Sequence, residues 1–176
     1  MSPHLSINNN ARTRTDWYDF QNIPEALRKQ LDTTDILLLP SGYRNAEHAF
    51  AESTSLFLQW CQQKEYNIDI CVNDDEYELV ELNSSCIRLG RINLKKAVGS
   101  IFFGLLINFI YDLGKGNVQS LMNNDSDIVT QGEEKTVSFT LAVEDSKGTT
   151  KEYHYEGPVE SVKEVTEEIK TLWNED

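Results

Sequence analysis

The sequence predicts an α+β domain: a small mixed β-sheet packed by two long helices, with a C-terminal β-hairpin plus an amphipathic helix. Over residues 16–113 of the 176, the spacing of apolar residues predicts strands and helices in the order β-α-β-β-β-α. Residues 93–113 form a nearly uncharged helix that needs cover on almost every side. Residues 135–176 alternate as a hairpin and then take helical spacing, which completes the same domain.

The N-terminal segment is polar. Residues 1–15 include Asn8–Asn10 and no long apolar run, so we expect a disordered tail and no signal peptide. Aromatic side chains within 17–20 are expected to anchor the chain on the domain surface. Ile23–Leu31 is expected to be a short helix, because Pro24 is tolerated in a first turn.

The pattern of residues 35–89 predicts the strands at the centre of the sheet. Asp35–Leu39 is a continuous apolar run, the pattern of a strand that is buried on both faces. A long helix is expected over Asn45–Lys64, and Asn67–Val72 returns as a strand, so this unit can form a right-handed parallel crossover. Tyr77–Leu82 and Ser85–Leu89 are expected to be two short strands that pair antiparallel.

The central helix is expected to run from Leu94 to Leu113, because Asn93 is a good N-cap and Gly114 suits the position just past the end. Its small and polar residues recur every four positions. They are Lys96, Ser100, Gly104, Asn108 and Asp112. This stripe would allow another element or a ligand to approach closely.

The uncharged part of that helix is too short for a typical membrane span. Ala97–Tyr111 would extend about 22 Å at 1.5 Å per residue, against a hydrocarbon core of about 30 Å. The prediction is therefore a buried core helix. Membrane contact and an oligomer interface are the two alternatives.

The last third is predicted to be a polar loop followed by a compact unit. Residues 114–134 show little periodicity. Lys135–Val143 and Thr150–Glu156 alternate as the two strands of a hairpin. Gly157 and Pro158 then begin an amphipathic helix with acidic residues on its outer face.

The chain is acidic, with a net charge of −13. Residues 125–176 carry 14 acidic and 5 basic residues, a net charge of −9. Such a field repels nucleic acid and anionic lipid headgroups, so we expect no nucleic-acid partner and no membrane partner. It favours a basic protein partner. Three cysteines without C-x-x-C spacing indicate buried, reduced thiols and a cytoplasmic protein.

A small-anion or nucleotide pocket is one candidate site. Ser41, Arg44, Glu47 and His48 follow the buried strand, where the expected helix would begin and where α/β sheets bind ligands. Arg44 would hold the anion, and Glu47 or His48 would move a proton, with Glu52 orienting the histidine. Neither of the glycine-rich phosphate-binding motifs, G-x-G-x-x-G and G-x-x-x-x-G-K-S/T, is present, so the position lacks a phosphate-binding motif.

Two patterns resemble metal sites, but we do not expect either of them to bind a metal. Asn123, Asp125, Asp127 and Glu134 match four places of a calcium loop, but Ile128 occupies the place that needs glycine. His154 shares a strand face with two glutamates that lie about 7 Å away, without a second cluster in sequence. We therefore expect neither a metal nor a cofactor.

The function predicted from these features is a non-enzymatic, acidic, cytosolic protein–protein interaction module of the inhibitor, immunity or defence accessory, or adaptor type. The absence of a catalytic motif and the charge asymmetry favour this class. A homo-oligomer is compatible with the sequence. The small-anion enzyme or sensor around Ser41–His48 is the alternative. The expected partner-binding residues are Asp74, Asp75, Glu76, Glu78, Glu160, Glu164, Glu167 and Glu168.

Overall fold

The structure, a computed structural model, describes residues 4–41, 48–73, 76–80, 86–114, 135–144 and 149–174. The strands in these ranges are β1 (His4–Ala11), β2 (Ile36–Leu39), β3 (Ala49–Ala51), β4 (Ile68–Ile70), β5 (Glu78–Val80), β6 (Cys86–Leu94), β7 (Thr136–Glu144) and β8 (Thr150–Pro158). The helices are α1 (Arg14–Phe20), α2 (Glu25–Asp32), α3 (Glu52–Gln63), α4 (Gly99–Gly114) and α5 (Val162–Asn174), with short 3-10 turns at Lys96–Val98 and Val159–Ser161.

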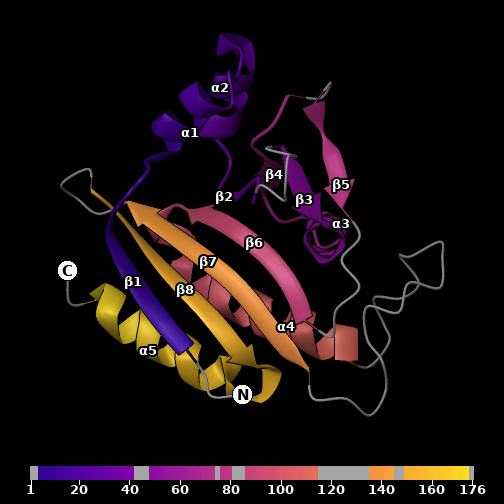
Figure 1. Ribbon diagram of the computed structural model, residues 1–176, viewed down its shortest axis with the longest axis vertical. Helices are drawn as coiled ribbons and strands as arrows, with labels where there is room; N and C mark the ends of the chain where they lie inside the picture. The colour runs from indigo at the N-terminus through magenta and orange to yellow at the C-terminus, as the bar shows by residue number, and fades with distance from the viewer. Residues whose placement is uncertain are drawn as a thin grey trace.

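One mixed sheet organises the described residues. Its strand order is β1-β8-β7-β6-β2-β4, and β3 and β5 form a separate pair (Figure 1). β2 and β4 are parallel with α3 between them in sequence, which confirms the predicted crossover. β7 and β8 form the predicted antiparallel hairpin. The α+β class is therefore confirmed.

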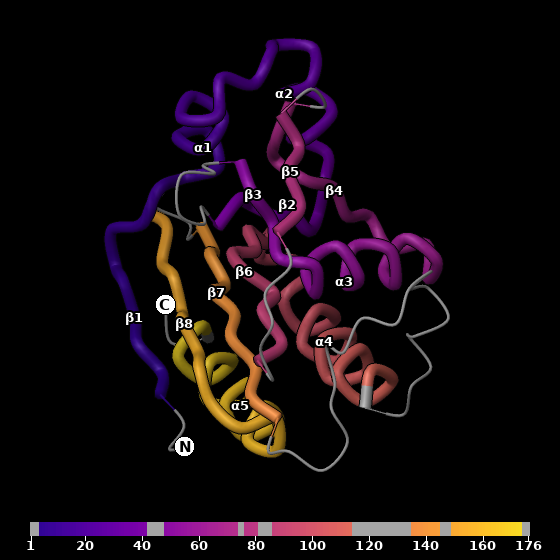
Figure 2. The backbone as a smooth tube through the Cα atoms, turned by 45° about the vertical axis from the view of Figure 1, so that its right-hand side comes forward, coloured from indigo at the N-terminus to yellow at the C-terminus, as the bar shows by residue number. Residues whose placement is uncertain are grey.

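The helices cover the two faces of this sheet unequally (Figures 1 and 2). Phe57 of α3, Phe109 of α4 and Ile169 of α5 are fully buried in one core with the sheet. On the opposite face, Leu37 of β2 packs in a second cluster with Trp17 of α1. β2 is thus buried on both faces, as its continuous apolar run predicted.

The expected disordered tail is wrong over residues 4–15. β1 pairs antiparallel with β8 from His4 opposite Glu156 onward, and α1 begins at Arg14. The segment is polar and has weak strand propensity of its own. A partner strand almost 150 residues away in sequence decides its conformation, and no local pattern reveals that pairing.

The expected helix start at Asn45 is also wrong. Ala49–Ala51 forms β3, which pairs parallel with β5, and α3 begins only at Glu52. β5 lies in the predicted strand Tyr77–Leu82, but it pairs with β3 and not antiparallel with the strand that follows. Short Ala- and Phe-containing segments suit both structures, so tertiary pairing decides between them.

The central helix begins later than predicted. Asn93 is not its N-cap, because β6 continues to Leu94 and pairs on its two sides with β2 and β7. α4 starts at Gly99, after the 3-10 turn. The predicted polar loop at 114–134 lies outside the described residues apart from Gly114.

α4 is core on one face, whereas the sequence predicted cover on almost every side. Ile101 and Tyr111 on its other face are 58% and 60% exposed. The buried residues of α4 are Phe102, Phe103, Leu105, Leu106, Phe109, Ile110 and Leu113. The window Lys96–Leu113 is long and apolar enough to cross a bilayer by length and composition, and 44% of it is buried within the protein. Core helices of soluble proteins share these properties of length and composition.

Arg14 ties α1 and α2 to the sheet. Its Nε donates to Asn93 Oδ1 at 2.8 Å, and its Nη1 donates to the carbonyls of Leu31 at 3.1 Å and Thr34 at 2.7 Å. One side chain therefore joins the end of α2, the start of β2 and the end of β6. The planar guanidinium suits this role because its donors have a fixed geometry.

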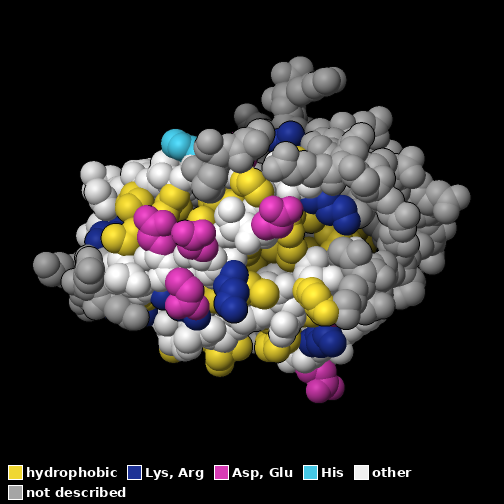
Figure 3. Space-filling view, turned by 90° about the horizontal axis from the view of Figure 1, so that it is seen from below, with side chains coloured by type: hydrophobic (Ala, Val, Ile, Leu, Met, Phe, Trp, Pro, Cys, Tyr) yellow, Lys and Arg dark blue, Asp and Glu magenta, His cyan; other side chains and the backbone are white. Residues whose placement is uncertain are grey.

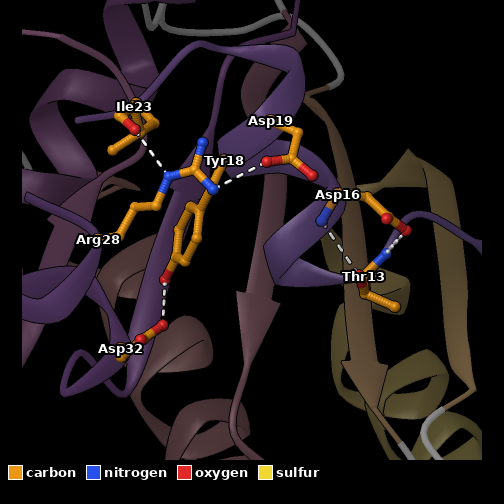
Figure 4. A network of polar contacts seen from close by, with 7 residues as sticks. All are labelled: Thr13, Asp16, Tyr18, Asp19, Ile23, Arg28 and Asp32. Atoms are coloured by element: carbon orange, nitrogen blue, oxygen red, sulfur yellow. Dashed lines mark hydrogen bonds and ion pairs between the residues drawn. The ribbon is translucent and has the colours of Figure 1, made fainter. Parts of the chain in front are cut away.

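Local polar contacts hold α1 and α2 together (Figure 4). Thr13 and Asp16 form a capping box at the start of α1. Arg28 of α2 donates to Asp19 and to the Ile23 carbonyl. Tyr18 donates to Asp32 at 3.0 Å. Burial, and then this hydrogen bond, raise the pKa of Tyr18.

Replacing Arg14 with lysine is expected to destabilise the protein by about 2–3 kcal/mol, because lysine cannot satisfy Asn93 and two carbonyls together. Urea unfolding measures this loss. The matched control is Arg12→Lys, since exposed Arg12 only stacks over the Trp17 and Phe20 rings and its loss should stay below about 1 kcal/mol. Equal losses for the two variants would contradict the role of Arg14.

α4 and α5 cross at Gly99. A Cβ atom placed on Gly99 would lie 2.8 Å from the Trp173 ring, which also packs edge-to-face against Phe103 at 6.1 Å between centroids. Gly104 lies five residues further on, and a Cβ atom placed there would have no atom of another described element within 4 Å. The two glycines of α4 therefore face opposite environments.

The substitution Gly99→Ala is expected to destabilise the protein by about 1–2 kcal/mol, because the Trp173 ring must shift to admit the methyl group. Gly104→Ala is the matched control. It should stabilise the protein by about 0.5–1 kcal/mol, since alanine is the better residue in a helix interior. Urea unfolding at low protein concentration compares them, and a stabilising Gly99→Ala would show that this crossing is loose.

Candidate functional site

The predicted small-anion pocket is only partly described. The Ser41 amide donates to the Ala49 carbonyl at 3.1 Å, so these two residues form the base of the connection between β2 and β3. The Ser41 hydroxyl lies against Gly90, so a side chain at position 90 would have no room. Gly90 also has a φ of +71°, which favours glycine. Arg44 and Glu47 lie outside the described residues.

His48 does not contact Glu52 in the way predicted, because it precedes β3 and is not in a helix. Its Nδ1 is hydrogen-bonded to Gln21 Oε1 from the end of α1. Its Nε2 lies 3.5 Å from Glu76 Oε2. The structure thus brings together His48 from the predicted anion pocket and Glu76 from the predicted acidic surface, and Gln21 is a partner that the sequence did not indicate.

This arrangement does not favour an anion at His48. Both ring nitrogens are directed at oxygen atoms, one of an amide and one of a carboxylate. A nearby carboxylate repels an anion, and an imidazolium between two acceptors has no ring N–H left to donate. The geometric reason for the pocket, a helix beginning at Asn45, is absent because residues 49–51 form β3.

The cysteines are thiols in or near the core. Cys61 and Cys71 are fully buried and Cys86 is half-buried. Burial raises the pKa of Cys71 to about 12 and raises that of Cys61 as well. A thiol that stays protonated at neutral pH is a poor nucleophile, so these two residues have the properties of core side chains.

The two predicted acidic groups lie far apart. Glu160, Glu164, Glu167 and Glu168 are exposed at α5 and in the turn before it, whereas exposed Glu76 and Glu78 lie at β5. Figures 1 and 2 place β5 in the upper part of the molecule and α5 at the bottom. Asp74 and Asp75 lie outside the described residues. The two groups therefore form separate surfaces.

The α5 surface is of mixed composition. Figure 3, seen from below, shows acidic side chains beside basic ones, with hydrophobic side chains between them. Lys170 Nζ lies 3.4 Å from Glu167 Oε1, one turn away in the helix. Such an exposed pair contributes little to stability. The acidic character of the surface therefore depends mainly on Glu160, Glu164 and Glu168.

A row of polar side chains crosses the sheet on the face opposite the main core. Arg91, Thr140, His154 and Ser6 are neighbours in register on four adjacent strands. Thr140 Oγ1 and His154 Nδ1 are 2.8 Å apart, so His154 has a threonine partner. Within the described residues, no group of three or more His, Cys, Asp or Glu side chains is placed to hold a metal ion.

A cavity lies at the carboxyl ends of β6 and β7, where no sequence pattern indicated one. It has a volume of about 300 Å³ and is lined by Arg14, Asp32, Asn93, Leu94, Lys95, Lys96 and Glu144. Its charges are mixed, and Arg14 directs its donors at protein oxygens. Among these lining residues, the exposed Lys95 and Lys96 are therefore the cations left to bind a ligand.

The comparisons with known proteins return no relative: no family model, no curated protein and no solved structure matches the chain.

The raised pKa of Cys71 predicts a loss of stability in alkali. Above its ordinary value of 9.0 the unfolded thiol loses its proton, while the folded thiol keeps it up to about pH 12. The free energy of unfolding should therefore fall with pH in this window, by about 1.4 kcal/mol per pH unit from this group. Cys71→Ala should remove that part of the slope.

Urea unfolding between about pH 9.5 and 11 under reducing conditions measures the slope. Val72→Ala is the control, because it shortens a neighbouring buried side chain without removing a thiol. It should lower stability at every pH and keep the wild-type slope. A wild-type slope in Cys71→Ala would show that this thiol ionises in the folded protein.

Proposed function

We propose that this chain is a non-enzymatic protein–protein interaction module of the cytoplasm, of the inhibitor, immunity or defence accessory, or adaptor type. Its partner is a basic protein. The observation that carries the proposal is the row of exposed glutamates along α5, namely Glu160, Glu164, Glu167 and Glu168.

The platform beneath these glutamates is rigid. The inner face of α5 is buried in the main core through Val162, Val165, Ile169 and Trp173. Its start is joined to the hairpin, since the Val159 amide donates to the Lys135 carbonyl and Tyr155 donates to the Pro158 carbonyl. A fixed backbone under these carboxylates means that binding a complementary surface costs side-chain entropy but little backbone entropy.

The β5 group is the weaker candidate for the same role. Glu76 already faces His48, and Glu78 is the other described carboxylate there. Because β5 lies in the upper part of the molecule and α5 at the bottom, one compact partner would contact only one of the two groups (Figure 2). α5 offers more carboxylates on one continuous element.

Two observations support a binding role over catalysis. The buried thiols have raised pKa values, which disfavours cysteine nucleophiles. His48 and His154 are each hydrogen-bonded to a side chain of another element, Gln21 and Thr140 respectively. Neither contact is to a serine or cysteine, and the Thr140 hydroxyl beside His154 belongs to a buried side chain.

The test is a variant in which the four glutamates of the α5 surface are changed to glutamine. The net charge then changes from −13 to −9. Because the side chains are exposed, stability should change by less than about 1 kcal/mol. The tagged protein is incubated with extract of its native host at low and at high salt, and the retained proteins are identified.

The control variant removes four exposed carboxylates elsewhere, by changing Glu25, Glu65, Glu144 and Glu156 to glutamine. Both variants have the same net charge, so a general charge effect would be equal in the two. We expect a basic protein to be retained by the wild type and the control, and lost with the α5 variant and at high salt. Equal retention by all three would refute the α5 surface.

A further inference from the structure

We propose that the cavity at the carboxyl ends of β6 and β7 binds a free amino acid with an acidic side chain, such as glutamate or aspartate. None of the residues that line it belongs to α5, so the proposal does not depend on the glutamates of that helix. The cavity has a volume of about 300 Å³, at the small end of the range of about 300–1,000 Å³ for ligand pockets. This volume suits a molecule of amino-acid size.

The place of the cavity in the fold is one at which sheets bind ligands. β6 and β7 are parallel neighbours, so their carboxyl ends meet at one edge, and ligands of open α/β sheets bind beyond such ends. In Figure 1 this edge lies below α1, the helix that contributes Arg14 to the lining. The chain leaves β6 through the 3-10 turn Lys96–Val98 and then α4, and the N-terminal end of a helix carries a partial positive charge.

Arg14 gives the cavity a positive charge that its hydrogen bonds do not neutralise. Its acceptors are the Asn93 side chain and the backbone carbonyls of Leu31, Thr34 and Asn93, all of which are uncharged. Burial lowers the pKa of Arg14, because the guanidinium loses water that would solvate its charge. Among the described residues, no carboxylate forms an ion pair with it. An anion in the cavity would therefore stabilise this partly desolvated cation.

Lys95 and Lys96 add two further cations on a backbone that is held in place. The Lys95 amide donates to the Asp35 carbonyl at 3.2 Å, and the Lys95 carbonyl accepts from the Val98 amide at 3.1 Å. Both side chains are exposed and line the cavity. In a chain with a net charge of −13, three cations around one cavity are a local departure from the overall field. They favour a ligand with an anionic group.

Two carboxylates line the same cavity, and they disfavour an ion such as phosphate that carries negative charge alone. Tyr18 donates to one oxygen of Asp32, so the other oxygen can accept a hydrogen bond from a ligand. Glu144 is exposed at the end of β7. These groups repel an anion but attract an ammonium group. A free amino acid carries both an ammonium group and a carboxylate, so it can pair with both kinds of lining residue.

The number of charges favours an acidic side chain on that amino acid. Arg14, Lys95 and Lys96 supply three positive charges, and Asp32 and Glu144 supply two negative charges. Glutamate and aspartate each carry two carboxylates and one ammonium group, so either would neutralise the lining. A neutral amino acid would leave one cation of the cavity without a counter-charge.

Isothermal titration calorimetry of the full chain with L-glutamate and L-aspartate in dilute buffer tests the proposal. We expect a dissociation constant between about 1 µM and 1 mM, since the ligand is small. Glutarate lacks the ammonium group, and glutamine lacks the second carboxylate. Each should bind at least about tenfold more weakly than glutamate, because charged groups of the cavity then stay unpaired. Inorganic phosphate should not compete with glutamate.

A double variant, Lys95→Gln with Lys96→Gln, should weaken glutamate binding at least about tenfold. The matched control is Lys29→Gln with Lys163→Gln, which also removes two exposed lysines. Both double variants carry two positive charges fewer than the wild type, a net charge of −15. The control should bind glutamate like the wild type. Both should keep the wild-type circular dichroism spectrum, because the four side chains are exposed.

The variant Glu144→Gln separates binding of the ammonium group from binding of the carboxylates. It should weaken glutamate binding several-fold, because the ammonium group loses a partner. It should strengthen glutarate binding, because that ligand then meets one carboxylate fewer. A general effect of net charge would strengthen the binding of both ligands.

Three results would overturn the proposal. The first is a wild type that binds neither glutamate nor aspartate at concentrations up to about 10 mM. The second is equal binding of glutamate by the wild type and by the variant that lacks Lys95 and Lys96, which would place any binding elsewhere. The third is glutarate or phosphate that binds as tightly as glutamate, which would make the cavity a general anion site. None of these results bears on the retention of a basic protein by α5, so the two proposals fail separately.

Discussion

The parallel pairing of β6 with β7 is the constraint on which the rest of the structure depends. Parallel neighbours cannot be joined by a tight turn, so the chain must cross over one face of the sheet between Leu94 and Thr136. α4 is part of that crossover, and its Phe- and Leu-rich side is buried there. The same pairing brings the C-terminal hairpin beside the N-terminal strands, so that α5 packs against α4 through Gly99 and Trp173.

The opposite face of the sheet is closed by a different kind of interaction. Among the described residues, α1 and α2 cover the β2–β4 end there, and the cover is fixed by hydrogen bonds as well as by apolar contact. Arg14 accounts for much of this, because its guanidinium bonds to Asn93 at the end of β6 and to two carbonyls near α2. The remaining strands keep a polar face on which Thr140 and His154 are hydrogen-bonded. The molecule therefore has one apolar layer and one partly polar layer.

The exposed faces of α4 and α5 follow from this layering. α4 and α5 both have an inner face in the main core, so their outer faces are held rigidly and differ in chemistry. α5 presents glutamates with two lysines, whereas the outer side of α4 is uncharged between Lys96 and Asp112.

The fold class, the buried strand predicted at Asp35–Leu39, the hairpin of β7 and β8, and the presence of an apolar helix before Leu113 could be predicted from the sequence, because each has a strong local pattern. Tertiary pairing decided the rest. The polar β1 became a strand only through β8, and Asn93 became a strand residue through β2 and β7. The predicted anion pocket depended on a helix start that β3 replaced, and the contact of His48 with Gln21 joins residues 27 positions apart. Exposure of the α5 glutamates followed from the helical spacing. Their separation from β5, and the opposite environments of Gly99 and Gly104, depend on which distant elements pack together, and a local pattern carries no information about that.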